Sequence, residues 1–552
     1  MRILSILGLV VLFAGGLAAQ TAIHSGPSRV FHVYVGPQTF VRDQAGYLYT
    51  AYADRIQSTP SARFDVFIGR STDGGKSWNM KWQSGFAYNT GTDYGNRIPS
   101  LAIDDQGNLH CSWYHQVSST SNMSVRYNRW DAQKNAWGTE QTMVASGYKR
   151  SVQALAVDAQ NTVWMLCSNT GSYSLDVKRS DKPYASDMKF SNASPAFTHS
   201  GTCQYPDLIV DAAGRIHVSY YSTSNGATVH HQWLDPGAAS PKWSAALPLG
   251  NSNGTADYYS SMAADLAGNV YVVYSVDGQR NKTHDPEWFL RKWDGSTQTW
   301  SGAVSIYKTT RKQYEPTSST YNDDRVFSAA CDETTGEVYF VYRNFESGEL
   351  LLGRWHDGDA APTDYAKLMN TGSLPVNSRN YFIFPQFRGS IFPSFNRASG
   401  GLDLVYTVGD QNAPSPMYNL FYEHFPVGSL SSTGTPKIGT SYTLDLSAVM
   451  DANKAYLLAL SMTDIQPGIP IARRFIPLAA DSMFFLTAMN LIPVMFQQFQ
   501  GVLSGAGAAQ AKIAIPNMPA LVNIKIYGAF ITYPGAAGVN AISNPFTFVI
   551  TS

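Results

Sequence analysis

Four arginines stand at equivalent places along this chain, each seven or eight residues before the Asp or Asn of a recurring turn. They are Arg97, Arg150, Arg325 and Arg388. A guanidinium group is planar and binds a carboxylate through two parallel, charge-assisted hydrogen bonds. Arginines that converge on one pocket therefore predict a ligand with a carboxylate, such as an acidic sugar. The alternative is that each arginine pairs with a nearby acid and is structural; the nearby acids are Asp93, Asp207, Asp323 and Asp324.

Two residues that are adjacent in sequence, Tyr314 and Glu315, provide a candidate nucleophile and its base. The glutamate can accept the phenolic proton as the tyrosine attacks, and a tyrosine avoids the repulsion between a carboxylate nucleophile and an anionic substrate. Comparable positions are held by Tyr258, Tyr259 and Tyr381. The candidates for the proton donor are Asp54 and Asp277, which follow predicted strands, and Asp323 or Asp324, which precede one.

A repeat is expected to position these residues. Each copy has an apolar strand, an Asp or Asn, a turn, and a second strand that ends on an aromatic residue or Cys. The turn residues are Asp43, Asp104, Asp158, Asp211, Asp265, Asp332 and Asn396. The spacing of roughly 53 to 67 residues fits four antiparallel strands per copy, which is the size of a propeller blade. The sequence therefore predicts an all-β protein with a seven-bladed β-propeller.

The start of the first strand and the end of the second strand of each blade fall on one face of such a propeller, so function is expected at that central mouth. The last copy has no evident outer strand. We expect residues Val30 to Val35 to complete it and to remove the open sheet edge.

The segment from Ser71 to Trp78, Ser-Thr-Asp-Gly-Gly-Lys-Ser-Trp, resembles the Asp-box, or BNR repeat, of the sialidase superfamily. An Asp in a turn accepts backbone amides, Gly supplies a positive φ, and the Trp buries its ring over the hairpin. We therefore expect Ser71, Asp73, Gly75 and Trp78 to be structural.

A second resemblance to this superfamily lies in Arg97-Ile98-Pro99, which is similar to the R-I-P motif at the first arginine of sialidases. In that family three arginines hold the carboxylate of sialic acid, a Tyr activated by a Glu is the nucleophile, and an Asp supplies acid and base. The resemblance implies a substrate-binding role for Arg97 alone. Here the motif follows the Asp-box blade, whereas in the family it opens the first blade.

Residues Tyr94 to His115 are loosely similar to uronate lyases on seven-bladed propellers, including the ulvan lyases, which use one His before the first strand and one after the second. Here Asn96 holds the first place and His115 the second, so the pair is incomplete. A single His at a strand end is commonly a hydrogen-bonded structural residue.

The chain has 552 residues, which predicts more than one domain. Residues 1–20 are typical of a secretory signal peptide, with Arg2 before an apolar run and Leu17-Ala18-Ala19 at its end. We expect the propeller at 28–426, a linker at 427–438 and a small C-terminal β-sandwich at 439–552. The protein is expected to be secreted, outside the cell or at its surface, without a transmembrane segment.

Lys plus Arg and Asp plus Glu number 40 each, which argues against a nucleic-acid partner. We expect a disulfide between Cys167 and Cys203, because antiparallel geometry puts both at one face of neighbouring blades. Cys111 and Cys331 are expected to be small buried residues. No metal site and no cofactor are expected, and the sequence does not indicate an oligomeric state.

The sequence therefore favours a secreted, sialidase-like glycoside hydrolase acting on an acidic terminal sugar. The alternatives are a lyase of uronate polysaccharides and a propeller that binds a glycan or a protein without catalysis.

Overall fold

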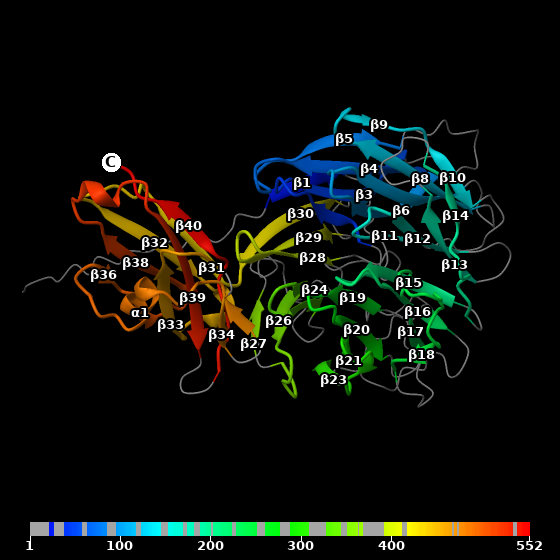
Figure 1. Cartoon of the computed structure of the whole chain (residues 1–552). Helices are drawn as coiled ribbons and strands as arrows, with labels where there is room; N and C mark the ends of the chain where they lie inside the picture. Colours follow the sequence, from blue (N-terminus) through cyan, green and yellow to red (C-terminus); the bar gives the residue numbers. More distant parts are fainter. Residues whose placement is uncertain are drawn as a thin grey trace, which may run out of the picture. The chain divides into compact units, whose positions relative to one another are not determined.

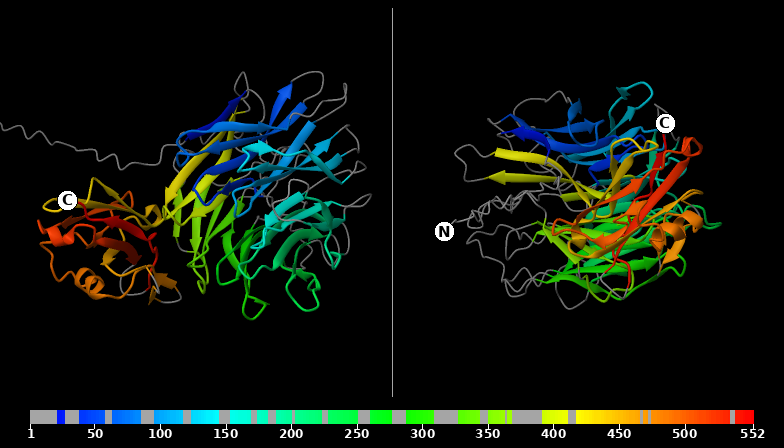
Figure 2. Two further views of the ribbon diagram at one scale, coloured as in Figure 1. Left: turned by 45° about the horizontal axis from the view of Figure 1, so that its top comes forward. Right: turned by 90° about the vertical axis from the view of Figure 1, so that its left-hand side faces the viewer.

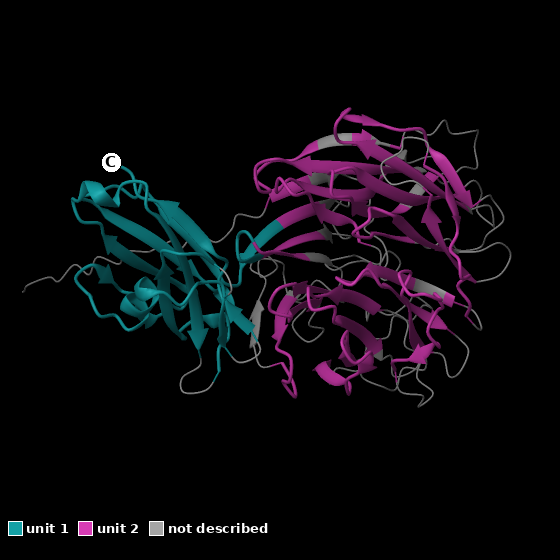
Figure 3. Ribbon diagram, in the orientation of Figure 1, with its two compact units in different colours: residues 1–20, 398–401, 423–552 teal, residues 21–397, 402–422 magenta. Residues whose placement is uncertain are grey.

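The computed structural model describes most of the strands and leaves gaps between them. The described residues are 21–26, 38–57, 63–84, 95–116, 123–144, 153–168, 174–181, 188–199, 203–222, 228–250, 260–276, 287–308, 327–343, 350–362, 364–367, 391–410, 417–465, 468–471, 474–533 and 538–552. The chain divides into two compact units (Figure 3). Unit 2 comprises described parts of 21–397 and 402–422, and unit 1 comprises 398–401 and described parts of 423–552.

Unit 2 is built from small sheets, most of which are formed by antiparallel strands that are consecutive in the chain (Figure 1). The first strands are β2 (Phe40–Arg42), β3 (Leu48–Gln57), β4 (Arg63–Ser71) and β5 (Asn79–Gln83), followed by β6 (Gly95–Ile103), β7 (Leu109–Gln116), β8 (Met123–Asp131), β9 (Ala136–Trp137) and β10 (Gln141–Val144). One parallel bridge, between Phe64 and Gly95, joins these two groups into a nine-stranded sheet.

The following sheets repeat this order. They comprise β11 (Gln153–Val157), β12 (Val163–Ser168), β13 (Leu175–Ser180) and β14 (Phe190–Asn192); β15 (Cys203–Val210), β16 (Ile216–Ser222), β17 (Thr228–Leu234) and β18 (Leu247–Pro248); and β19 (Ser260–Ala264), β20 (Val270–Val276), β21 (Glu287–Asp294), β22 (Thr299–Trp300) and β23 (Val304–Lys308). The last two are β24 (Phe327–Asp332), β25 (Glu337–Arg343), β26 (Leu350–Trp355) and β27 (Asp364–Lys367), and β28 (Ile391–Asn396), β29 (Gly401–Asp410) and β30 (Met417–Pro426) with β1 (Thr21–Gly26).

The first strand of each group lies innermost, and these inner strands form a closed ring. β2 contacts β6, and contacts continue through β11, β15, β19 and β24 to β28, which contacts β2 again. Figure 2 shows the sheets of unit 2 arranged around this ring. An arrangement of this kind brings the ends of separate sheets to a common axis.

The strand that completes the last sheet is β1, which pairs antiparallel with β30 from Thr21↔Tyr422 to Gly26↔Tyr418. The predicted closing strand, Val30 to Val35, lies outside the described residues, and the outer place beside β30 is already filled. Closure by the N-terminal part of the chain is thus present, but an earlier segment performs it. Ile23 packs into an apolar cluster with Phe40 and Tyr422, which explains why this segment is chosen.

The predicted disulfide is not formed, since Cys167 and Cys203 are both free thiols. Side chains alternate between the two faces of a strand. Cys167 therefore lies with Val163 and Met165 on the face of β12 that packs against the preceding sheet. Cys203 packs with Trp164 and Leu166 on the opposite face of the same strand. The prediction placed both cysteines at the right end of their strands but did not consider which face each side chain occupies. Cys111 and Cys331 are buried free thiols.

The turn aspartates share one hydrogen-bonding pattern, in which Oδ1 accepts the backbone N–H four residues later and Oδ2 contacts a polar side chain six residues later. Those side chains are Tyr49 for Asp43, His110 for Asp104, Trp164 for Asp158, His217 for Asp211 and Tyr271 for Asp265. Each aspartate thus ties its turn to the second strand of its sheet, so its role is structural.

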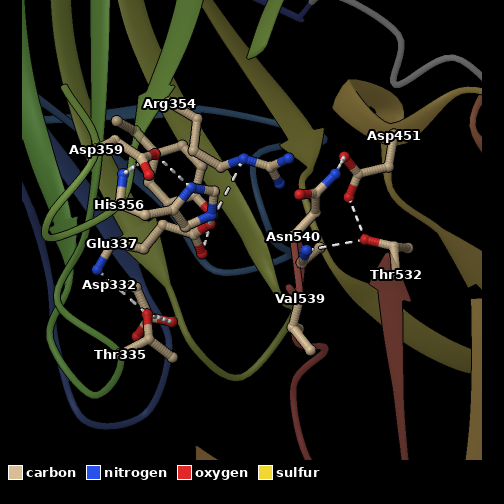
Figure 4. Close-up of polar contacts among 12 residues, drawn as sticks. Asp332, Thr335, Glu337, Arg354, His356, Asp359, Asp451, Thr532, Val539 and Asn540 are labelled. Carbon is tan, nitrogen blue, oxygen red and sulfur yellow. Dashed lines mark hydrogen bonds and ion pairs between the residues drawn. The ribbon is translucent and has the colours of Figure 1, made fainter. Parts of the chain in front are cut away.

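The turn after Asp332 is one residue longer, and Glu337 accepts the hydrogen bond of Tyr339 in its place. His356 lies between two carboxylates here: its Nε2 is 2.7 Å from Glu337 Oε1 and its Nδ1 is 3.1 Å from Asp359 Oδ2 (Figure 4). The guanidinium of Arg354 is buried beside Glu337. The turn region of this sheet therefore holds the carboxylates of Glu337 and Asp359 close to an arginine and a histidine.

Unit 1 contains two four-stranded antiparallel sheets. One has the order β31 (Ser429–Thr433), β32 (Ser441–Ser447), β38 (Ala508–Ala514) and β36 (Phe496–Gln497), and the other has β37 (Gln500–Val502), β33 (Ala455–Ser461), β39 (Lys525–Tyr533) and β40 (Phe546–Val549). The sheets share one apolar core that includes Leu444, Leu458 and Phe530. A short hairpin of β34 (Ile469–Ile471) and β35 (Arg474–Ile476) and the helix α1 (Ser482–Ala488) complete the unit.

The segment predicted as a linker, 427–438, contains strand β31. Leu430 of this strand is buried in the core of unit 1. This Gly-, Ser- and Thr-rich segment thus contains a strand that pairs with β32 and places its one large apolar side chain in the core. Elsewhere in this unit the buried Asp451 accepts hydrogen bonds from Thr532 and from Asn540 (Figure 4). Among the described residues, no helix has the length and apolar character needed to cross a membrane.

Candidate ligand-binding site

A cavity of about 540 Å³ follows the axis of the ring in unit 2. Every inner strand contributes to its wall, and the wall residues lie mostly in the second half of each strand, for example Ile103 of β6, Val157 of β11 and Val210 of β15. The inner strands therefore run in the same direction along the axis. Their first residues gather at one end of the cavity, where the sequence predicted the site.

Arg97 is the one predicted arginine whose backbone is described. It lies in the first half of inner strand β6 and pairs with Tyr114 of β7. Its side chain is outside the described part, as are Arg150, Arg325 and Arg388 altogether. In the sequence these three residues precede the inner strands β11, β24 and β28 by three, two and three positions.

His115 is the next residue of β7 after Tyr114, and it pairs with Asn96 of β6. The structure thus brings Asn96, Arg97, Tyr114 and His115 together at the end of one strand pair. The His115 side chain is only 1% exposed. A residue so deeply buried is positioned to orient a neighbour more readily than to contact a bulky polysaccharide.

Of the predicted catalytic residues, Asp54 is described, whereas Tyr314, Glu315 and Asp277 lie outside the described residues. Asp54 is buried near the end of β3 and pairs with Asp65 of β4. Asp65 accepts hydrogen bonds from Val66 N and the Ser84 hydroxyl, which fixes it as a structural acid. Since the two acids are direct partners, both lie at the end of β3 and the start of β4, on the side of the sheet where the inner strand β2 begins.

The residues Ser71 to Trp78 form the turn between β4 and β5. Asp73 Oδ1 accepts hydrogen bonds from the Ser71 hydroxyl at 2.7 Å and Ser77 N at 2.9 Å, and Asp73 Oδ2 accepts from the Ser77 hydroxyl at 2.6 Å. These bonds lower the pKa of Asp73 to about 2. Gly75 has a φ of +89°, and a Cβ there would lie 1.9 Å from the ring of Tyr422. The residues close a turn against β30, away from the axial cavity.

Sequence reasoning considered Asp207 only as an arginine partner, but this acid lies in the wall of the axial cavity and is 4% exposed. Its Oδ2 accepts Met262 N of the next inner strand at 2.8 Å, and its Oδ1 accepts Leu208 N. Burial nevertheless raises the pKa of Asp207 to about 7. Ser100 and Ser261 occupy the same place four residues before their turn aspartates, and each accepts an amide of the next sheet. The sequence did contain a signal for this residue, because Asp207 stands where the repeats of Ser100 and Ser261 have a serine.

A second pair that sequence reasoning missed joins His199 and Cys203, whose Nδ1 and Sγ are 2.9 Å apart at the start of β15. His199 Nε2 accepts the backbone N–H of Leu175, so the ring proton is on Nδ1 and points to the sulfur. Burial raises the pKa of Cys203 to about 12, which keeps the thiol protonated at neutral pH. In the part of the chain that the structure describes, no three His, Cys, Asp or Glu residues are grouped so that they could hold a metal ion.

No protein-family profile matches the sequence, and no curated protein matches it. Several solved structures are similar in fold at low identity. An α-L-arabinanase of Penicillium chrysogenum is 13% identical over 74% of this chain and 98% of its own, with a TM-score of 0.39. An ulvan lyase is 12% identical over 72% of this chain and 95% of its own, with a TM-score of 0.45. A Hadza microbial sialidase is 14% identical over 56% of this chain and 63% of its own, with a TM-score of 0.34.

These similarities concern the arrangement of the strands and not the chemistry of the site. The fold of unit 2, a closed ring of small antiparallel sheets, is the arrangement of a β-propeller.

Proposed function

We propose that unit 2 is a seven-bladed β-propeller whose mouth binds the carboxylate of an acidic terminal sugar and that it hydrolyses the glycosidic bond of that sugar. The observation that carries this proposal is the place of Arg97 in the first half of an inner strand, at the end of the ring where the inner strands begin. We further propose that the protein is secreted after removal of residues 1–20.

The blade count is supported by the inner strands of the described residues, which are β2, β6, β11, β15, β19, β24 and β28 and which contact one another in a closed ring. Pairing of β1 with β30 gives the last blade its fourth strand. For unit 1, the core shared between two four-stranded sheets supports a β-sandwich.

A carboxylate clamp is supported by the common direction of the inner strands. Three of the arginines stand just before an inner strand in the sequence: Arg150 before β11, Arg325 before β24 and Arg388 before β28. Arg97 stands in the same way before Ser100 of β6. Two or more guanidinium groups around one carboxylate provide charge-assisted hydrogen bonds that a neutral sugar cannot receive. The clamp thereby gives both affinity and selectivity for acidic sugars.

The proposed reaction proceeds in two displacements. The Tyr314 oxygen attacks the anomeric carbon while Glu315 accepts its proton, and Asp54 or Asp277 donates a proton to the departing glycosidic oxygen. The same Asp then takes a proton from water, whose oxygen displaces the tyrosine, and Glu315 returns its proton to the phenolate. The sugar is released with its original anomeric configuration.

The test measures hydrolysis of an aryl glycoside of sialic acid and binding of free sialic acid by wild type, Arg97→Ala and Arg325→Ala. We expect each variant to lose at least about tenfold in affinity, as for loss of a hydrogen bond to a charged group, with little change in melting temperature. Arg126→Ala is the matched control, because Arg126 lies in β8, two strands away from the inner strand β6, and pairs with Glu140. Unchanged affinity in both arginine variants would remove the clamp.

A second candidate function is elimination on a uronate polymer, favoured by the pairing of Asn96 with His115 beside Arg97. In that reaction a base removes the proton at C5, the C4–O bond breaks, and a C4–C5 double bond forms. A rise in ultraviolet absorbance with a uronate polysaccharide, lost in His115→Gln, would establish it. If the protein binds an acidic sugar but catalyses neither hydrolysis nor elimination, it is a non-catalytic receptor.

A further inference from the structure

Ile98 has an unusual backbone for its residue type, with a φ of +51°. A β-branched residue is strongly disfavoured in this left-handed region. The other described non-glycine residues with positive φ are all amides: Asn135, Asn161, Asn453, Asn490, Asn523, Gln298 and Gln498. Ile98 is therefore the one β-branched residue held there in the described part of the chain. It directly follows Arg97.

A β-bulge accompanies this conformation. Arg97 pairs with Tyr114 and Ser100 pairs with Ser112, so β6 advances three residues while β7 advances two. The extra residue on β6 interrupts its regular pairing with β7, and a β-bulge generally bends the strand that carries it. Bulges of this kind are used beside functional sites to redirect a side chain.

The segment that contains Arg97 is fixed at both ends. Gly95 has a φ of +83°, and a Cβ there would lie 2.1 Å from the carbonyl oxygen of Phe64, so only glycine permits this approach of β6 to β4. At the other end, Ser100 Oγ accepts the backbone N–H of Leu155 in β11 at 3.1 Å. Between them the Ile98 side chain is buried, with 3% exposed. Burial and these two anchors hold the unfavourable φ in place.

Strand β15 offers a comparison within the same molecule. Gln204 pairs with Tyr221 and Asp207 pairs with Ser219, which is the same one-residue shift, and Pro206 stands where β6 has Pro99. At the place of Arg97, however, this strand carries the neutral Gln204. The same register shift is therefore present without an arginine, and Tyr205, at the place of Ile98, is not among the described residues with a positive φ.

We propose that Ile98 is a positioning residue, whose left-handed backbone within the bulge directs Arg97 to the carboxylate of the bound sugar. This inference rests on the proposed function. Residues held in strained conformations persist where the surrounding structure over-determines them, and they concentrate at binding and catalytic sites. The fixed backbone of Ile98 would then restrict the orientation of Arg97 before the ligand binds.

The experiment measures sialic acid affinity by titration calorimetry in wild type, Ile98→Gly, Arg97→Ala and the double variant. Glycine admits many backbone conformations, so Ile98→Gly is expected to weaken binding about tenfold. In the Arg97→Ala background the same change is expected to have no further effect, because a residue that acts through Arg97 has nothing left to position. Tyr205→Gly in β15 is the matched control and is expected to leave affinity unchanged.

Two further results separate the possible failures. If Ile98→Gly does not fold, Ile98→Asn replaces it; Asn accepts the left-handed region and is expected to retain affinity, while a loss as large as that of Arg97→Ala would overturn the proposal. An equal loss from Ile98→Gly with and without Arg97 would also overturn it and leave the clamp intact. Wild type that does not bind sialic acid would overturn the clamp and this inference together.

Discussion

Individual acids in this protein are tuned in opposite directions by their surroundings. Hydrogen bonds from serine hydroxyls and a backbone amide lower the pKa of the exposed Asp73, whereas burial raises the pKa of Asp207 although it accepts two amides. The same residue type therefore closes a turn at Asp73, with a lowered pKa, and lines the axial cavity at Asp207, with a pKa near neutral pH.

Asp73→Ala is expected to lower the melting temperature above about pH 4 and to leave turnover unchanged. The folded-state pKa of Asp73 is depressed, so its stabilisation is complete above the unfolded pKa and is lost as pH falls toward 2. Thermal unfolding between pH 2 and pH 7 checks this. A difference between wild type and variant that persists at pH 2 would contradict it, and Asp235→Ala, in another exposed turn, is the control.

Asp207→Ser is expected to stabilise the protein at pH 8, on the order of 2 kcal/mol, with no gain near pH 4. The folded-state pKa of Asp207 is raised, so its stabilising effect is complete below the unfolded pKa and is lost as pH rises toward 7. Serine reproduces the acceptor that Ser261 provides to the next sheet. Denaturant unfolding at both pH values measures the difference, and an equal gain at both would show that ionisation is not responsible.

At the scale of strands, the burial of a side chain depends on the face of the strand that it occupies. This dependence explains which predictions from the sequence were correct. The turn aspartates and the inner strands follow directly from local sequence, because each turn is closed by bonds within ten residues. The disulfide prediction was wrong because the Cys167 side chain lies on one face of β12, whereas Cys203 of β15 packs against the other face. The closing strand was misplaced because pairing between β1 and β30 joins residues roughly four hundred positions apart, which local patterns do not record.

Ile23→Asp is expected to release β1 and to destabilise unit 2 by about 2 kcal/mol, because a carboxylate would enter the cluster around Phe40 and Tyr422. The freed edge of β30 is then expected to promote self-association. Chemical unfolding and light scattering measure both effects. Ala22→Asp, whose side chain is exposed on the same strand, is the control, and equal behaviour of the two variants would contradict the role of Ile23.

For the whole molecule, the repeat length indicated the architecture, but the loops that would complete the candidate site could not be predicted from strand patterns. In the sequence, Tyr314, Glu315 and three of the four arginines stand between the segments predicted as strands, where no period of two indicates the direction of a side chain. Asp207 was recognisable in principle, since an acid stands where Ser100 and Ser261 accept amides. The bulge at Ile98 was not, because its backbone departs from what isoleucine favours.

Unit 1 has a core of its own, so residues 427–552 are expected to fold when expressed separately and to unfold in one cooperative transition. Calorimetry checks this. Leu444→Asp, in the core, is expected to abolish the transition, while Val494→Asp, at a side chain that is 81% exposed, is expected to preserve it. A fragment without a cooperative transition would contradict the expectation.

The pairing of β1 with β30 also sets the order in which the molecule can be assembled. Of the strands in unit 2, β1 leaves the ribosome first, and its partner is the last to be made. Until residues up to Tyr422 have been synthesised, β30 cannot pair with β1 and the ring of sheets cannot close. During that time β1 must not pair with another strand. Folding of unit 2 is therefore expected to be completed only after its whole sequence has been synthesised.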